Sequence, residues 1–153
     1  MGTLKSKSLK KKQEPKSATG IKYSDKSKGQ PELLPIYDEI KKLLMPYEKG
    51  NMKLRGGADG NVGLINEMAV VIDGRKKDEI WFAYALIQKG YVGFYYMPIY
   101  MQEKVRAQIS PELMKCLKGK ACFHIKKFDP VIFEKIKEAL AIGYKNFKEQ
   151  GWI

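Results

Sequence analysis

Apolar residues spaced three and four positions apart begin soon after residue 30 of the chain. These apolar positions are Leu33, Ile36, Tyr37, Ile40, Leu43, Leu44 and Tyr47. Charged residues such as Asp38 and Lys41 stand between them. Because residues at this spacing share one face of an α-helix, the pattern predicts an amphipathic helix over residues 33–47. Pro46 and Gly50 are typical of a helix end.

The next regular pattern is typical of β-strands. Residues 64–72 are rich in Val and Ile and end at Asp73-Gly74, a strong signal for a two-residue turn. A shorter strand is expected to begin at Met52, before a glycine-rich segment. That segment lacks the Gly-Lys-Ser/Thr of a phosphate-binding loop, so we interpret it as a hairpin loop.

Two further strands are predicted over residues 79–88 and 91–97. The first is apolar at both odd and even positions, as a central strand covered on both faces would be. Only Lys89-Gly90 separates the two segments. Because a parallel return needs a crossover of about a dozen residues, the short turns predict an antiparallel meander.

In the last third of the chain, a capping residue followed by proline twice marks the start of a helix. Ser110 before Pro111 predicts a short helix to about Leu117, with serine as its N-cap. Residues 121–126 then alternate as a strand does. Ala121, Phe123 and Ile125 fall on one face of it, and Cys122, His124 and Lys126 fall on the other.

Asp129 and Pro130 begin the closing helix in the same way, and Gly151 ends it after about Lys148. Its apolar stripe consists of Ile132, Ile136, Ala139, Leu140, Gly143 and Phe147. Taken together, the elements predict an α+β domain. We expect a mostly antiparallel sheet of four to five strands, packed by an N-terminal and a C-terminal helix.

Charge changes the picture of the N-terminus. Residues 1–30 hold nine lysines and two acidic residues, so more than half of the formal net charge of +12 lies there. Almost no apolar residue accompanies these lysines, so the segment cannot bury enough surface to offset its ordering entropy. We therefore expect residues 1–30 to form a disordered lysine-rich arm and residues 31–153 to form a single domain.

Composition also limits the classes of function. No apolar run approaches the roughly 18 residues of a membrane helix, and the N-terminus lacks an apolar signal region. Two cysteines outside a C-x-x-C pair and one histidine do not have the spacing of a zinc site. We expect a cytoplasmic protein with reduced thiols. No nucleophile–base pair can be located from spacing, so we do not expect an enzyme.

Three blocks near the C-terminus resemble a known family. They are Gly-Phe-Tyr-Tyr-Met-Pro-Ile-Tyr-Met at 93–101, Ile-Ser-Pro-Glu-Leu at 109–113 and Gly-Lys-Ala-Cys-Phe-His-Ile-Lys-Lys at 119–127. With the closing helix to Ile153 they resemble the YdhG-like family, small bacterial domains of unknown function. The resemblance covers residues 33–153 and implies a compact α+β fold with an antiparallel sheet. Some relatives are described as frataxin-like iron chaperones, so the resemblance also implies iron binding.

Cys122 and His124 are the candidate metal ligands, because residues i and i+2 of a strand face the same side. One imidazole and one thiolate make half of a metal site, and a semi-exposed strand face beside Lys126 is the simpler interpretation. The adjacent acidic residues at 38–39 and 78–79 are interleaved with lysines, which would repel a cation.

Aromatic residues of the predicted meander are candidates for ligand binding. Trp81, Tyr84 and Tyr95 are the sheet-face candidates. An aromatic sheet face near basic charge can stack single-stranded bases, although no Lys/Arg-Gly-Phe/Tyr block typical of RNA-recognition domains occurs. Aromatic residues on strands also commonly form core, and this alternative stays open.

The arm offers a second binding hypothesis. Lys10, Lys11 and Lys12 predict weak, salt-sensitive association with nucleic acid, and the simpler alternative is a solubilising tail. The leading hypothesis is a non-enzymatic cytoplasmic module that binds a small ligand or a protein partner through its sheet face. The alternatives are a frataxin-like iron chaperone and nucleic-acid association through the arm.

Overall fold

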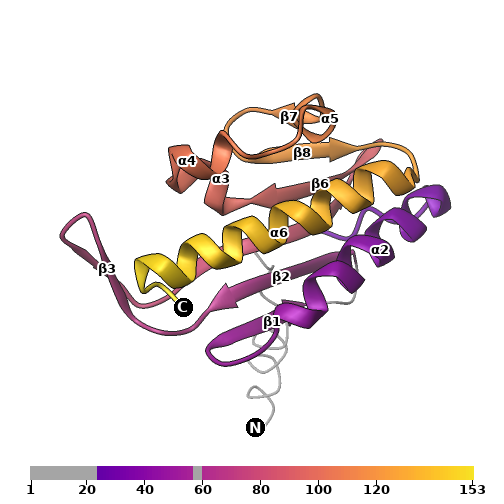
Figure 1. Ribbon diagram of the computed structural model, residues 1–153. Helices are drawn as coiled ribbons and strands as arrows, with labels where there is room; N and C mark the ends of the chain where they lie inside the picture. Colours follow the sequence, from indigo (N-terminus) through magenta and orange to yellow (C-terminus); the bar gives the residue numbers. More distant parts are fainter. Residues whose placement is uncertain (1–23, 57–59) are drawn as a thin grey trace, which may run out of the picture.

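The computed structural model describes residues 24–56 and 60–153 of the chain. Within these residues the main layer is a six-stranded antiparallel sheet of order β1-β2-β5-β6-β8-β7 (Figure 1). Its strands are β1 (Met52–Gly56), β2 (Asn61–Asn66), β5 (Ile80–Gln88), β6 (Tyr91–Tyr96), β7 (Leu117–Lys118) and β8 (Cys122–Ile125). The α+β class, the antiparallel sheet and the helices at both ends are confirmed. The described sheet has one strand more than the largest predicted number.

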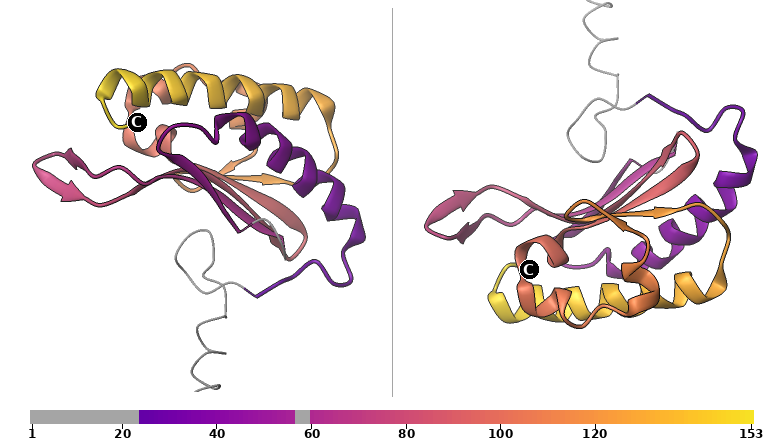
Figure 2. Two further views of the ribbon diagram at one scale, coloured as in Figure 1. Left: turned by 90° about the horizontal axis from the view of Figure 1, so that it is seen from below. Right: turned by 90° about the horizontal axis from the view of Figure 1, so that it is seen from above.

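Two long helices, α2 (Leu34–Leu44) and α6 (Pro130–Gln150), lie on the same side of the sheet (Figure 2). Single 3-10 turns, η1 (Pro31–Leu33) and η2 (Met45–Tyr47), flank α2. The predicted start of α6 is confirmed, since the Asp129 side chain accepts a hydrogen bond from the N–H of Val131 at 3.0 Å. Gly151 ends α6 with a φ of 78°, a backbone conformation that favours glycine.

Short helices join β6 to the edge of the sheet: α3 (Met97–Met101), α4 (Glu103–Arg106) and α5 (Pro111–Met114). Ser110 caps α5 as predicted, accepting from the N–H of Leu113 at 3.3 Å. The predicted helix to about Leu117 is too long. The chain leaves α5 at Met114 and forms β7, whose Lys118 lies opposite Cys122 across the turn at Gly119.

The predicted single strand over residues 64–72 is wrong. β2 ends at Asn66, and a separate hairpin of β3 (Val70–Ile72) and β4 (Arg75–Lys77) projects from the sheet (Figure 1). The reason is Asn66, whose amide donates to the carbonyl of Trp152 and accepts from the N–H of Met68 at 3.2 Å. These bonds turn the chain away, while β2 pairs directly with β5.

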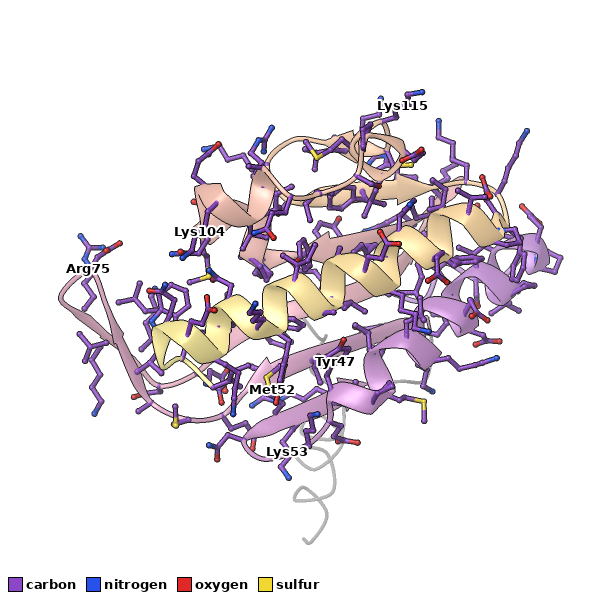
Figure 3. All side chains as sticks on the ribbon, in the orientation of Figure 1. Tyr47, Met52, Lys53, Arg75, Lys104 and Lys115 are labelled. Atoms are coloured by element: carbon purple, nitrogen blue, oxygen red, sulfur yellow. The ribbon has the colours of Figure 1, made fainter. Side chains whose placement is uncertain are left out.

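The hairpin turn is the predicted one. Asp73 and Gly74 both have positive φ angles, of 51° and 76°, as a two-residue turn between twisted strands requires. Figure 3 places Arg75 at the outer end of the hairpin, away from the main sheet. The hairpin therefore projects from the main sheet as a separate two-stranded sheet.

The core lies between the sheet and the two long helices. The Phe82 ring is at 5.3 Å from the Phe147 ring and at 6.3 Å from the Tyr96 ring, measured between centroids. Ile36 and Ile40 of α2 are buried against the same cluster. Since the core occupies one side of the sheet, the residues that point to its other side do not pack against α2 and α6.

Candidate aromatic binding face

The side of the sheet opposite α2 and α6 carries a cross-strand row that spans every strand of the main sheet. Arg55 of β1 lies opposite Gly63, Gly63 opposite Tyr84, and Tyr84 opposite Tyr95. The row continues to Cys122 and Lys118 at the other edge. Because directly opposite residues point to the same face, these side chains share one surface.

A β-bulge on β5 determines which aromatic residues reach this surface. Leu64 pairs with Ala83 while the next residue, Ile65, pairs with Trp81, so Phe82 is an extra residue on β5. Strict alternation would place residues 81 and 84 on opposite faces. The bulge brings the rings of Trp81 and Tyr84 together at 5.8 Å in an edge-to-face contact.

Two stacked ring pairs lie on the same surface. Tyr84 and Tyr95 stack at 4.6 Å with an interplanar angle of 15°, and Tyr91 and His124 stack at 3.7 Å with an angle of 11°. All four residues are half-buried, as is Trp81. We call Trp81, Tyr84, Tyr91, Tyr95 and His124 the aromatic face. The structure thus brings together the three aromatic residues named from the sequence.

The aromatic face also includes two aliphatic side chains that are separate from the main core. Ile65 is 0% exposed and Leu86 is 6% exposed, yet neither belongs to the core cluster beneath the helices. Their registers place them beside the central row, opposite Trp81 and Gly93. The aromatic face therefore includes aliphatic side chains as well as rings.

Glycine at position 93 makes room for one of the rings. A Cβ atom at Gly93 would lie 2.9 Å from Cε1 of Tyr95 and 3.5 Å from Sγ of Cys122. The Tyr95 ring therefore lies along β6 above Gly93. A larger residue at 93 would displace this ring from its stack with Tyr84.

Ionisable groups along β8 are held neutral at pH 7. Burial, followed by the nearby charges of Lys118 and Lys126, lowers the pKa of His124 below its ordinary value of 6.5. Burial raises the pKa of the Cys122 thiol, which shares a hydrogen bond with the Tyr95 hydroxyl. Burial and the Cys122 contact raise the pKa of Tyr95. The centre of the aromatic face is uncharged, with lysines at its edge.

Arg55 anchors the opposite edge of the aromatic face. Its guanidinium lies 2.7 Å from Oε1 of Glu79 and 3.4 Å from Oε2 of Glu67. Its Cζ atom lies 5.7 Å from the centroid of the Trp81 ring, within the range of a cation–π contact. Arg55 could not be identified from the sequence, because only strand register and the bulge connect it to Trp81.

The metal candidates form no complete site in the described part of the chain. Cys122 and His124 share a face as predicted, but no group of three or more His, Cys, Asp or Glu side chains gathers among the described residues. Of the acidic pairs, Glu39 lies 3.5 Å from Lys42, and Glu79 is bound to Arg55. Glu39 and Glu79 therefore form ion pairs with basic side chains of the protein itself.

A groove lies between the β3–β4 hairpin, α3 and the C-terminal end of α6. It has a volume of about 870 Å³ and is lined by Trp81, Val71, Tyr100, Met101 and Trp152, among others. Val71 and Tyr100 are 66% and 56% exposed. Trp81 thus belongs to both the aromatic face and this groove.

The described chain enters the domain on the side of the aromatic face. Figure 2 shows residues 24–30 on the side of the sheet away from α6. Gln30 fastens this segment to the β5–β6 turn, because its amide donates to the carbonyl of Gln88 at 3.1 Å and accepts from the N–H of Gly90 at 2.7 Å. Lys10, Lys11 and Lys12 lie outside the described residues.

No family model, curated protein or solved structure matches the chain. Among the described residues, no helix combines the length and the apolar character that crossing a membrane requires. The YdhG-like resemblance stays a prediction.

Proposed function

We propose that this protein is a non-enzymatic binding module that takes a ligand with planar rings on its aromatic face. The observation that carries this proposal is the Tyr84–Tyr95 stack, which lies in the central row opposite the two long helices. Aromatic side chains there do not contribute to packing between the sheet and the helices. They stack favourably with other rings, and their hydroxyl groups supply polar contacts.

The chemistry of the face favours binding over catalysis. A nucleophilic cysteine needs a lowered pKa, whereas burial raises the pKa of Cys122. The His124 ring stacks on Tyr91, at 3.7 Å between centroids. Both groups therefore support a neutral surface for a ring-bearing ligand.

Fluorescence of Trp81 tests the proposal. The chain has two tryptophans, so a Trp152→Phe background leaves Trp81 as the only one. Titration with nucleosides, flavin mononucleotide and indole compounds should change its emission saturably for at least one compound. Tyr84→Ala should weaken that binding about fivefold or more, because each stacked ring contributes roughly 1–3 kcal/mol.

The matched control is Phe128→Ala. Phe128 is 54% exposed and packs on Phe133 of α6, so it belongs to the helical side of the domain. Its replacement should leave binding unchanged. A flat titration with every compound, or equal losses for Tyr84→Ala and Phe128→Ala, would contradict the proposal.

The family assignment is part of the same proposal. The α+β fold agrees with the YdhG-like resemblance of residues 33–153, and we place the chain in that family on the three sequence blocks. The iron binding that the resemblance implies has less support, since Lys118 and Lys126 flank His124 and would repel a cation. Calorimetric titration with ferrous iron should show no binding at micromolar concentrations.

A further inference from the structure

We infer that the ligand of the aromatic face is single-stranded nucleic acid, which lies along β5 and β6 with its bases on the rings. Its phosphates would lie beside the lysines of the β7–β8 edge. This inference rests on the proposed function, because it names the class of ring-bearing ligand that the same face takes.

The spread of the rings favours a polymer over a single small molecule. Tyr84 lies opposite Tyr95, and Gln88 at the other end of β5 lies opposite Tyr91. At about 3.3 Å per residue, the distance along β5 from Trp81 to the level of Tyr91 is about 20 Å. One nucleoside cannot contact rings at both ends of this surface, whereas several linked bases can.

The charges at the edges match a phosphate backbone. Lys118 and Lys126 are exposed, and their charges act on His124. At the other edge, the carboxylates of Glu67 and Glu79 hold Arg55. Positive charge that can attract phosphate therefore lies at this edge of the sheet, at Lys118 of β7 and at Lys126 just after β8. The whole chain, at +12, attracts a polyanion from a distance.

The rings select single strands over duplexes. Bases in a duplex are stacked and paired inside the helix, so ring faces on a sheet cannot reach them. Unpaired bases can leave their own stack and lie on aromatic side chains. Such stacking tolerates different sequences, because every base has a π-face.

Fluorescence anisotropy with labelled oligonucleotides and the full-length protein tests this inference. The first probe is oligo-dT of about 12 nucleotides, within the site sizes of other single-strand binders. The second is an abasic strand of the same length and charge, and the third is a duplex of that length. Oligo-dT should bind at least about fivefold tighter than either. Equal affinity for the abasic strand would overturn the inference, because charge alone would then explain binding.

Variants locate the binding on the protein. Tyr84→Ala and Tyr91→Ala should each weaken oligo-dT binding about fivefold or more, and Phe128→Ala should not. Lys118→Gln should weaken binding and lower its salt dependence, whereas Lys137→Gln, on the exposed side of α6, should change neither. Circular dichroism checks each fold. If Tyr84→Ala does not fold, Tyr84→Leu keeps an apolar side chain without a π-face and should show the same loss.

Two further results separate this inference from its alternatives. A triple change of Lys10, Lys11 and Lys12 to Gln tests the arm. If the triple change abolishes oligo-dT binding and Tyr84→Ala leaves it unchanged, the nucleic acid binds the arm. That result would overturn the inference. Nucleosides that alter Trp81 emission, combined with no oligonucleotide binding, would overturn the inference and leave the proposed function standing.

Alkylation of the native protein gives an independent readout. Cys122 lies in the central row beside Tyr95, whereas the Cys116 thiol points to the carbonyl of Glu112. Bound oligo-dT should slow iodoacetamide modification of Cys122 at least severalfold more than that of Cys116, as measured by peptide mass spectrometry. If oligo-dT slows the modification of Cys122 no more than that of Cys116, this result would contradict binding on this face.

Discussion

The hydroxyl group of Tyr96 lies against the backbone of α6 beside Gly143. The hydroxyl donates a hydrogen bond to the carbonyl of Ala139, one turn before Gly143. A Cβ atom at Gly143 would lie 2.5 Å from this hydroxyl oxygen and 2.7 Å from Cγ of Pro98. Glycine at this position therefore lets β6 and α6 approach closely, which fixes the helix over the sheet.

Replacement of that glycine should destabilise the domain. Gly143→Ala forces Tyr96 or the helix to shift, at a cost of about 1–3 kcal/mol in the free energy of unfolding. Urea denaturation followed by circular dichroism measures this cost. Lys137→Ala, at an exposed position of the same helix, should stay within about 0.5 kcal/mol of the wild type. A wild-type midpoint for Gly143→Ala would contradict the close approach.

A double-mutant cycle tests the contact itself. Tyr96→Phe removes a buried hydrogen bond and should cost about 1 kcal/mol. It also removes the oxygen with which a Gly143→Ala methyl group collides. The double variant should therefore lose less stability than the two single variants together. Additive losses would show that the hydroxyl does not limit the space at residue 143.

The only histidine should titrate below its ordinary range. Burial and the charges of Lys118 and Lys126 lower the pKa of His124 below 6.5, so the unfolded chain takes up the proton first as the pH falls. The contribution of His124 to stability is therefore complete above about pH 6.5 and decreases at lower pH. NMR titration of the imidazole protons gives the pKa directly.

Lys118→Gln provides the control for that titration. It removes one of the two named charges and should raise the pKa of His124 towards 6.5, while Lys137→Gln should leave the pKa unchanged. A wild-type pKa at or above 6.5 would contradict the environment described for β8.

The thiol of Cys122 should react slowly at neutral pH. Burial raises its pKa, and the hydrogen bond with Tyr95 opposes this increase by stabilising the thiolate. Tyr95→Phe should therefore move the inflection of the alkylation rate of Cys122 to higher pH, with Cys116 as the internal reference. An inflection that moves to lower pH would show that the hydroxyl does not stabilise the thiolate.

The sequence patterns identified the long elements well, because helices and central strands carry strong periodicity. The stripe on residues 33–47 and the Asp129-Pro130 start of α6 are both present in the fold. The short strands β4 and β7 were not predicted. Each has two or three residues, too few for a period to appear, and pairing with a neighbouring strand determines both.

The candidate site was only partly predictable. Trp81, Tyr84 and Tyr95 could be named as aromatic strand residues, but their common face depends on the pairing of Ile65 with Trp81. The break after Asn66 depends on its bond to Trp152, which is 86 residues away in the chain. Long-range contacts of this kind leave no local pattern in the sequence.

The extra residue at Phe82 ties the ring-bearing surface to the backbone of β5. If β5 alternated regularly with Phe82 retained, the indole of Trp81 would turn into the interior, and two tyrosines would remain without the tryptophan. Loss of Phe82 would instead leave Trp81 and Tyr84 two positions apart and on one face, but would remove the ring that packs on Phe147. The irregularity thus serves both sides of the sheet, because it lets one strand send an indole outwards and a phenyl ring into the core.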